Sequence, residues 1–280
     1  TADFLVINGG ALLANSTFTL NSNRGLTLGA NGGTINTASG FDLTYGGVVS
    51  GTGDFNKTGD GRLILSGSNT YLGLTTITAG ILRAGNSLSL GGTATGTIVR
   101  PSGALELTGG ISIGGEALTL SGYGISSSGA VRNISGNNTY RGLITLTADS
   151  RINSDAGILL LDTTPNASVT GFYNIYFGGS SNITVNGPIT TGSKSLTKDG
   201  SGLLILSGAN TYSGATAVNA GALRAANSSA LGSVAGGVVV ADGAALELSG
   251  GISIGGEALT LNGSGISGGG SLRNIRDNNT

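Results

Sequence analysis

The chain has 280 residues, of which 54 are Gly, 3 are Pro and 10% are charged, and it contains no Cys, His, Met or Trp. Its 13 basic and 14 acidic residues leave a net charge of -1, which argues against a nucleic-acid partner and against a polybasic contact with anionic lipid. Without Cys or His, the usual zinc, iron–sulfur and haem sites and the Ser-His-Asp and Cys-His pairs cannot be built, so we expect no metal and no cofactor.

The residue types predict an all-β protein with a packed core. Hydrophobic residues make up 38% of the chain, and Leu, Ile, Val and Thr are frequent. Glycine this abundant is also found in collagen, but there is no Gly-X-Y period and Pro is scarce. No apolar run of about 18 residues occurs, and the first residues do not resemble a signal peptide. We therefore expect no direct membrane insertion, and secretion would require that the chain is cut from a longer precursor.

The N-terminal third contains diverged repeats. NSNRGLTL, beginning at Asn21, resembles NSDAGILL at Asn153, whereas the segment from Phe4 to Gly10 has no convincing partner. Repeats further along the chain are much clearer.

The segment 57–139 is duplicated as 198–280, with a shift of 141 residues and no gap. Roughly 50 of the 83 aligned residues are identical. A half-period of about 70 residues lies inside this block, because SGSNTYLG at Ser66 returns as SGNNTYRG at Ser135 and SGANTYSG at Ser207. Seventy residues divide into three units of about 23, the size of one coil of a β-helix. RDNNT at Arg276 begins a further copy, so we expect both ends to be cuts within a longer array.

Within each unit, apolar residues alternate over three to six positions before a Gly, Asn, Asp or Ser cluster, as at Leu63 and Leu65 or Leu105 and Leu107. A β-sandwich needs a different place for each strand, whereas a repeated unit can be buried only against its neighbour. A leucine-rich solenoid needs a frame that is absent here. The sequence predicts one continuous single-stranded, right-handed parallel β-helix over residues 1–280, with about 12 rungs and a length of about 60 Å.

Two segments resemble a known repeat. KTGDGRLILSGSNTYLGLTTITAGILRAG from Lys57 and KDGSGLLILSGANTYSGATAVNAGALRAA from Lys198 are similar to the autotransporter-associated β-strand repeat. The resemblance implies the passenger domain of a type V secreted bacterial protein, which forms a right-handed parallel β-helix outside the cell. It carries no catalytic residues to transfer.

The glutamates are the first candidates for chemistry. The chain has four, Glu106 and Glu116 with their copies Glu247 and Glu257. Paired carboxylates serve glycoside hydrolysis, but Glu106 lies between two inward leucines and is expected to face solvent, and Glu116 stands at a Gly-Gly turn. We expect solvated or turn-stabilising roles for them and no enzyme activity.

The Asn-Thr-Tyr turns are candidates for corner structure. Asn favours tight turns, and an aligned Tyr can pack over a corner, although an aromatic array is also suited to sugar binding. The residues are Asn69, Tyr71, Asn138, Tyr140, Asn210 and Tyr212.

The segment FYNIYF, residues 172–177, is the densest aromatic cluster and interrupts the better repeats. It is the best candidate for an interaction surface, through Phe172, Tyr173, Tyr176 and Phe177, although a core or edge-covering segment is the favoured interpretation.

These observations predict a structural stalk on the surface of a bacterial cell, associated with the outer membrane through parts not in this chain. The expected partners are neighbouring repeats of the same longer chain. The alternative function is an adhesin that binds host glycans or identical surface proteins through the faces of the helix, and a polysaccharide lyase or hydrolase is disfavoured.

Overall fold

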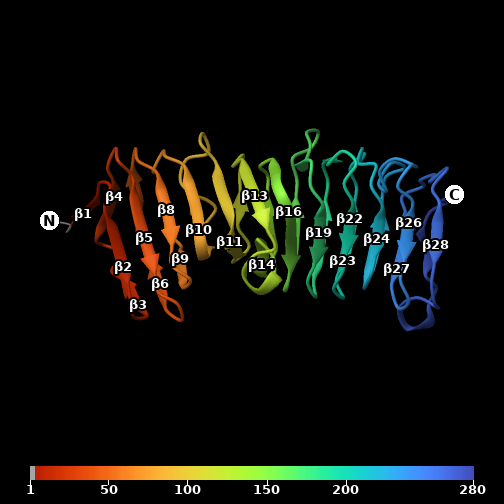
Figure 1. Ribbon diagram of the computed structural model, residues 1–280, viewed down its shortest axis with the longest axis horizontal. Coiled ribbons are helices and arrows are strands. Elements are labelled where there is room, and N and C mark those ends of the chain that lie inside the picture. The colour runs from red at the N-terminus through yellow and green to blue at the C-terminus, as the bar shows by residue number, and fades with distance from the viewer. Residues whose placement is uncertain (1–3) are drawn as a thin grey trace.

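The computed structural model describes residues 4–280, and residues 1–3 lie outside the described part of the chain. The described residues form a solenoid of about 12 turns with about 22 residues per turn, in which every strand pair is parallel. Figure 1 shows the coils stacked side by side from the N-terminus at one end to the C-terminus at the other. The prediction of an all-β parallel solenoid of about 12 rungs is confirmed.

The strands form three sheets that run along the rod. A short sheet at the N-terminal end contains β1 (Phe4–Ile7), β4 (Gly25–Leu28) and β7 (Val49–Gly51). An eight-stranded sheet contains β12 (Ser112–Ile113), β15 (Asn138–Tyr140), β17 (Ile158–Leu161), β20 (Asn182–Val185), β23 (Leu203–Leu206), β25 (Ala222–Ala225), β27 (Ala245–Ser249) and β29 (Leu272–Arg276).

The largest sheet covers two faces of the rod, because its longest strands bend from one face to the next. It contains β2 (Ala11–Ala14), β3 (Phe18–Leu20), β5 (Gly33–Thr37), β6 (Asp42–Tyr45), β8 (Phe55–Thr58), β9 (Arg62–Leu65), β10 (Thr75–Ala84), β11 (Thr97–Thr108), β13 (Leu118–Gly122), β14 (Val131–Ser135), β16 (Ile144–Ser154), β18 (Val169–Gly171), β19 (Ile175–Gly178), β21 (Ile189–Thr190), β22 (Leu196–Lys198), β24 (Thr216–Val218), β26 (Val238–Val240) and β28 (Leu259–Leu261). Two short 3-10 helices, η1 (Ile125–Ser127) and η2 (Ile266–Gly268), lie in the loops from β13 to β14 and from β28 to β29.

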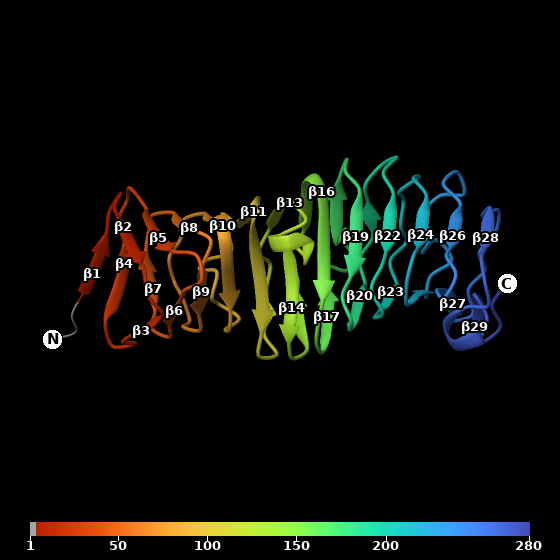
Figure 2. The same ribbon diagram turned by 60° about the horizontal axis from the view of Figure 1, so that its bottom comes forward.

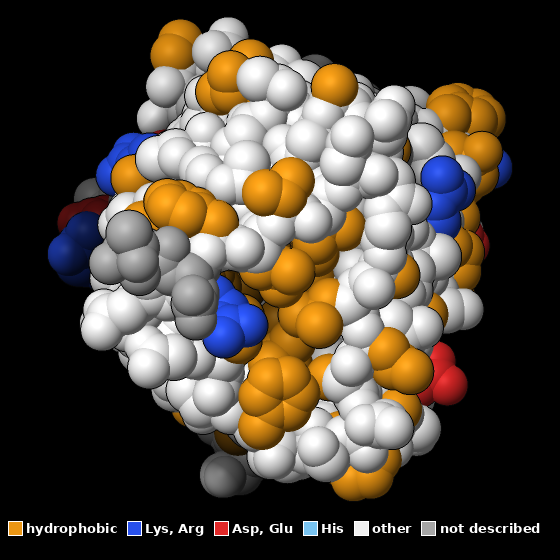
Figure 3. Space-filling model, turned by 90° about the vertical axis from the view of Figure 1, so that its left-hand side faces the viewer, with side chains coloured by type: hydrophobic (Ala, Val, Ile, Leu, Met, Phe, Trp, Pro, Cys, Tyr) orange, Lys and Arg blue, Asp and Glu red, His pale blue; other side chains and the backbone are white. Residues whose placement is uncertain are grey.

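Apolar residues of successive coils stack inside the rod in register. Leu63 of β9 pairs with Leu82 of β10, which pairs with Leu105 of β11, which pairs with Val131 of β14, and all four are buried. Each such side chain contributes about 1.5–3 kcal/mol when it is fully buried. Figure 3, a view onto the N-terminal end, shows hydrophobic side chains in the centre of the coil with other groups around them. Even the diverged segment Phe4–Ile7 forms a strand in this stack, paired with β4.

The two copies of the duplicated block lie on different faces of the rod. Lys57 pairs with Ile77 in the first half of β10, whereas its copy Lys198 pairs with Phe177, in the column that continues the second half of β16. One period of 141 residues therefore does not correspond to a whole number of coils. Equivalent side chains of the two copies consequently point in different directions around the axis of the rod.

Candidate functional site

The Asn-Thr-Tyr turns place their asparagines inside the corners of the solenoid. The Asn69 side chain accepts a hydrogen bond from the backbone N of Val49 at 2.9 Å and donates one to the carbonyl O of Ser89 at 2.7 Å. Asn210 makes the same two contacts, with Ile189 N and Ala230 O. Because each buried amide joins the coil before it to the coil after it, these asparagines tie three coils together.

The tyrosines of the same turns are completely buried. The Tyr71 hydroxyl lies 2.6 Å from Thr75 Oγ1, and the Tyr212 hydroxyl lies 2.7 Å from Thr216 Oγ1. Burial raises the pKa of both phenols. Rings that have no exposed surface cannot receive a ligand from solvent, so the turns form the corners of the rod.

Asn138 and Tyr140 vary this arrangement. Asn138 Oδ1 accepts from the backbone N of Ile111 at 2.7 Å, and its Nδ2 donates to Asn133. Ile144 stands where the other copies have Thr, four residues after the Tyr. Among the described residues the buried hydroxyl of Tyr140 consequently has no hydrogen-bond partner.

Glu106 corrects the expectation of a solvated glutamate. Its side chain points away from the core, but Arg83 and Arg132 on the adjacent coils cover it, and only 2% of it is exposed. Arg83 Nε donates to Glu106 Oε2 at 2.8 Å, and Arg132 Nη1 donates to Oε1 at 3.1 Å. Its copy Glu247 lies between Arg224 and Arg273 in the same way. These glutamates are therefore the centres of ion-pair rows that cross three coils.

Glu116, expected to have a solvated or turn-stabilising role, is buried at its turn, which excludes the solvated alternative. Its Oε1 accepts a hydrogen bond from Thr97 Oγ1 at 2.7 Å, while its Oε2 has no partner among the described residues. Burial raises the pKa of Glu116 to about 7, and the bond from Thr97 opposes this shift. The strand pattern contains the signal, because Glu116 has the same inward parity as Leu118 and Leu120.

Two buried lysines were not identified from the sequence. Lys57 Nζ donates to the carbonyl oxygens of Thr58, Gly59 and Ala79 at 2.8, 2.7 and 3.1 Å. Lys198 Nζ donates in the same way to Asp199, Gly200 and Ala220. Burial lowers the pKa of each ammonium to about 8. Lys57 has the parity of inward Phe55, which is the signal that the sequence carries.

The glycine two residues after each of these lysines has a positive φ. Gly59 has a φ of 72° and Gly200 a φ of 75°. A Cβ on Gly59 would lie 2.3 Å from the carbonyl O of Thr37, and one on Gly200 would lie 2.4 Å from that of Gly179. Glycine therefore allows both the left-handed turn and the close approach of the neighbouring coil.

The aromatic segment divides into an inner and an outer part. Phe177, predicted as part of an interaction surface, is instead completely buried, because it alternates with Tyr176 on β19 and stacks on Ile152. Phe172 and Tyr173 are exposed, and Tyr176 is half-buried. The Tyr176 ring meets the Tyr123 ring edge to face, with centroids 5.3 Å apart. The structure thus brings Tyr123, which the sequence did not single out, next to the predicted segment.

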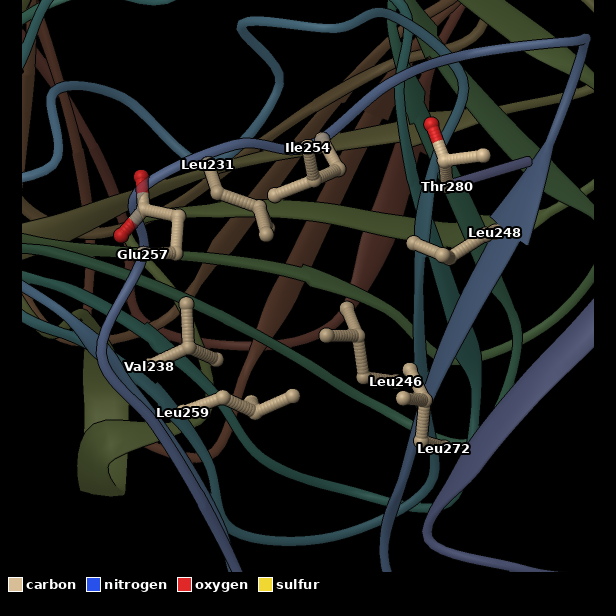
Figure 4. Close-up of a pocket in the computed structure, with 9 residues that line it drawn as sticks. All are labelled: Leu231, Val238, Leu246, Leu248, Ile254, Glu257, Leu259, Leu272 and Thr280. Atoms are coloured by element: carbon tan, nitrogen blue, oxygen red, sulfur yellow. The ribbon is translucent and has the colours of Figure 1, made fainter.

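An apolar hollow lies at the C-terminal end of the rod. Figure 4 shows Leu246, Leu248, Leu259 and Leu272 around it, with Glu257 at one side. The lining consists of inward residues of the last coils, so the hollow is the end of the core. Its position shows that the core residues of the terminal coils are open to solvent.

The described residues contain no group of three or more Asp or Glu side chains placed to hold a metal ion. None of the helices in residues 4–280 is long and apolar enough to cross a membrane.

Stacked parallel coils, buried Asn and Tyr corners and duplicated blocks define a repeat-built β-solenoid. The family model of the passenger-associated-transport-repeat matches residues 55–84 and 196–225. The chain is 32% identical over 310 aligned residues to the "Adhesin BmaC autotransporter" of Brucella suis biovar 1 (strain 1330), an alignment that covers 88% of this chain and 9% of that protein. No solved structure matches the chain.

The chain is an autotransporter-associated β-repeat protein. The two family matches contain the buried Lys, Asn and Tyr positions described above. The relationship to an autotransporter adhesin supports a surface passenger protein, and the chain spans only 9% of the length of that relative.

Proposed function

We propose that this chain is a stalk segment of a bacterial surface protein, a rigid rod that holds other parts of a longer passenger away from the cell and performs no catalysis. The observation that carries the proposal is the set of side-chain links that each span three coils, such as Asn69, Asn210 and the Arg83–Glu106–Arg132 row. Such links oppose bending and local opening, because a coil cannot leave the stack without breaking buried bonds on both sides.

A deletion that keeps the repeat in register tests the rod. Removal of residues 57–197, one period of 141, joins Asn56 to Lys198 and restores the same local sequence. We expect a folded protein that is shorter by about 30 Å in small-angle X-ray scattering. Removal of residues 57–187 joins Asn56 to Pro188 out of register and is the matched control, for which we expect unfolding. Loss of folding in the in-register variant would contradict a modular rod.

The non-catalytic role has its own test. We expect no depolymerisation when the chain is incubated with a panel of polysaccharides. Turnover that disappears on Glu106→Gln or Glu116→Gln substitution would overturn this part of the proposal. Antibodies raised against the chain are expected to label intact cells of the source bacterium, and labelling only after lysis would contradict a surface location.

A further inference from the structure

An aromatic patch on the side of the rod stands apart from the rest of the surface. We define it as Tyr123, Phe172, Tyr173 and Tyr176 together with Lys194. Phe172 is 59% exposed, Tyr173 39% and Tyr123 37%. Tyr123 follows β13, Phe172 and Tyr173 precede β19, which contains Tyr176, and Lys194 precedes β22; Figure 2 shows these strands near one another along the rod, with β16 between β13 and β19. By contrast, the repeat tyrosines Tyr71, Tyr140 and Tyr212 point inward and are buried.

The duplicated block shows that the loop after β13 does not need the Tyr123 ring. Tyr123 precedes the loop that contains η1, and its copy 141 residues later is Ser264, before η2. The two loops have the same backbone, with φ values of 72° at Gly124 and 76° at Gly265. A serine therefore suffices for this turn, so the turn itself does not require Tyr123.

Polar groups next to the patch are held in place by bonds between coils. Asp149 accepts from Asn174 N and Nδ2, each at 2.9 Å, and Asn174 Oδ1 accepts from Ser195 N at 2.9 Å. Arg151, which pairs with Tyr176 in register, forms an ion pair with Asp199. These polar groups are already held in place before a ligand binds, which lowers the ordering cost of binding next to them.

Lys194 is the charged residue of the patch, and it has no carboxylate partner among the described residues. Its Nζ lies 4.8 Å from the centroid of the Phe172 ring, and no salt bridge joins it to an acid among the described residues. The Phe172 ring also lies over Gly192, where a Cβ would come within 2.7 Å of it. The exposed Phe172 ring and an ammonium without a carboxylate partner among the described residues thus lie together.

We propose that the aromatic patch binds an acidic glycan, with the C–H face of a pyranose on the exposed rings and the carboxylate of that sugar at Lys194. This inference rests on the proposed surface rod and assigns the rod a ligand. A sugar fits better than a protein partner, because the patch spans a few coils spaced about 4.8 Å apart, whereas a stable protein interface buries about 800 Å² on each side. Amphipathic tyrosines among ordered polar groups suit a ligand that has both C–H faces and hydroxyls.

The test uses tetragalacturonic acid and its methyl ester, which differ in charge but share the same rings. Isothermal titration calorimetry on the 280-residue chain is expected to show saturable binding of the acid, with the ester at least about tenfold weaker. Lys194→Ala should reduce binding of the acid to the level of the ester. Tyr123→Ser introduces the residue that the second block carries. This substitution and Phe172→Ser should each weaken binding of the acid by about tenfold.

Leu72→Ser is the matched control, because Leu72 is an exposed apolar residue outside the patch. Its affinity is expected to equal that of the unsubstituted chain, and all variants should keep the same melting temperature. Absence of saturable binding, equal affinity for acid and ester, or patch variants that change only association between copies of the chain would each overturn the proposal. If the in-register deletion variant does not fold while the 280-residue chain still binds the acid, the stalk proposal is refuted and the glycan site is not.

Discussion

The two copies of the duplicated block share their main links between coils and differ at other outward positions. Lys57 and Lys198 make the same three bonds, and Glu106 and Glu247 sit between equivalent arginines. On the outside, Tyr123 is replaced by Ser264, and the copies face different sides of the rod. The comparison teaches that the links between coils define the repeat, while the outward positions can take on separate roles.

The buried lysines offer the largest test of this equivalence. Lys57→Met and Lys198→Met keep the length of the side chain but leave three turn carbonyls without their donor. We expect each variant to lose about 3 kcal/mol of unfolding free energy, measured by urea denaturation with circular dichroism. Lys194→Met, at the surface, should change it by less than about 0.5 kcal/mol. A difference above about 1 kcal/mol between the two buried variants would show that the copies are not equivalent.

The pH dependence of stability sharpens the comparison of Glu116 with Glu257. The pKa of Glu116 in the folded chain, about 7, lies above its ordinary value, so the folded state holds the proton more tightly than the unfolded state. Its contribution to stability is complete below about pH 4.5 and is lost as the pH rises to about 7, a fall of up to about 3 kcal/mol. Glu116→Gln should remove this fall between pH 4.5 and 7.5.

Glu257→Gln is the matched variant for that titration. Burial raises the pKa of Glu257 as well, but this copy lies beside the open end of the core and is more exposed. We therefore expect it to change the pH profile less than Glu116→Gln does. The buried lysines, with pKa values near 8, titrate above this pH window. An unchanged profile for Glu116→Gln would contradict a buried, protonated Glu116.

The arginine rows predict a smaller difference between the copies. Glu106→Gln removes a carboxylate that two arginines hold at 2.6 and 3.1 Å, and should cost about 2 kcal/mol. In the second row Arg273 is 3.6 Å from Glu247, so Glu247→Gln should cost about 1 kcal/mol. Thermal unfolding in low and in high salt measures both, and the more exposed, half-buried pair Arg62–Asp42 is the control, with little effect expected for Asp42→Asn. Equal losses in the two rows would contradict this ranking.

The sequence was sufficient for the fold, because period-two alternation and a fixed repeat length leave stacking as the way to bury Leu63 and its equivalents. The same alternation places Lys57 and Glu116 inward. Lys57 was overlooked and Glu116 was expected to be solvated or at a turn, since charged residues are rarely buried. The burial of Glu106 and the contact of Tyr123 with Tyr176 depend on which residues meet across coils. That register follows from coil lengths that differ by one or more residues, which a sequence period of about 23 does not resolve.

Removing the hydroxyls of the corner tyrosines should have the smallest effect on the free energy of unfolding. It also tests what replaces the threonine that is absent beside Tyr140. Tyr71→Phe and Tyr212→Phe each remove a hydroxyl bonded to threonine and should cost about 1 kcal/mol in urea denaturation. Tyr140→Phe should cost nothing, because Ile144 replaces that threonine and the Tyr140 hydroxyl has no partner among the described residues. A comparable loss for Tyr140→Phe would instead mean that this hydroxyl bonds the free oxygen of Glu116 on the preceding coil. A double-mutant cycle of Tyr140→Phe with Glu116→Gln would then give a coupling energy, and the missing threonine would have been replaced by a bond between coils.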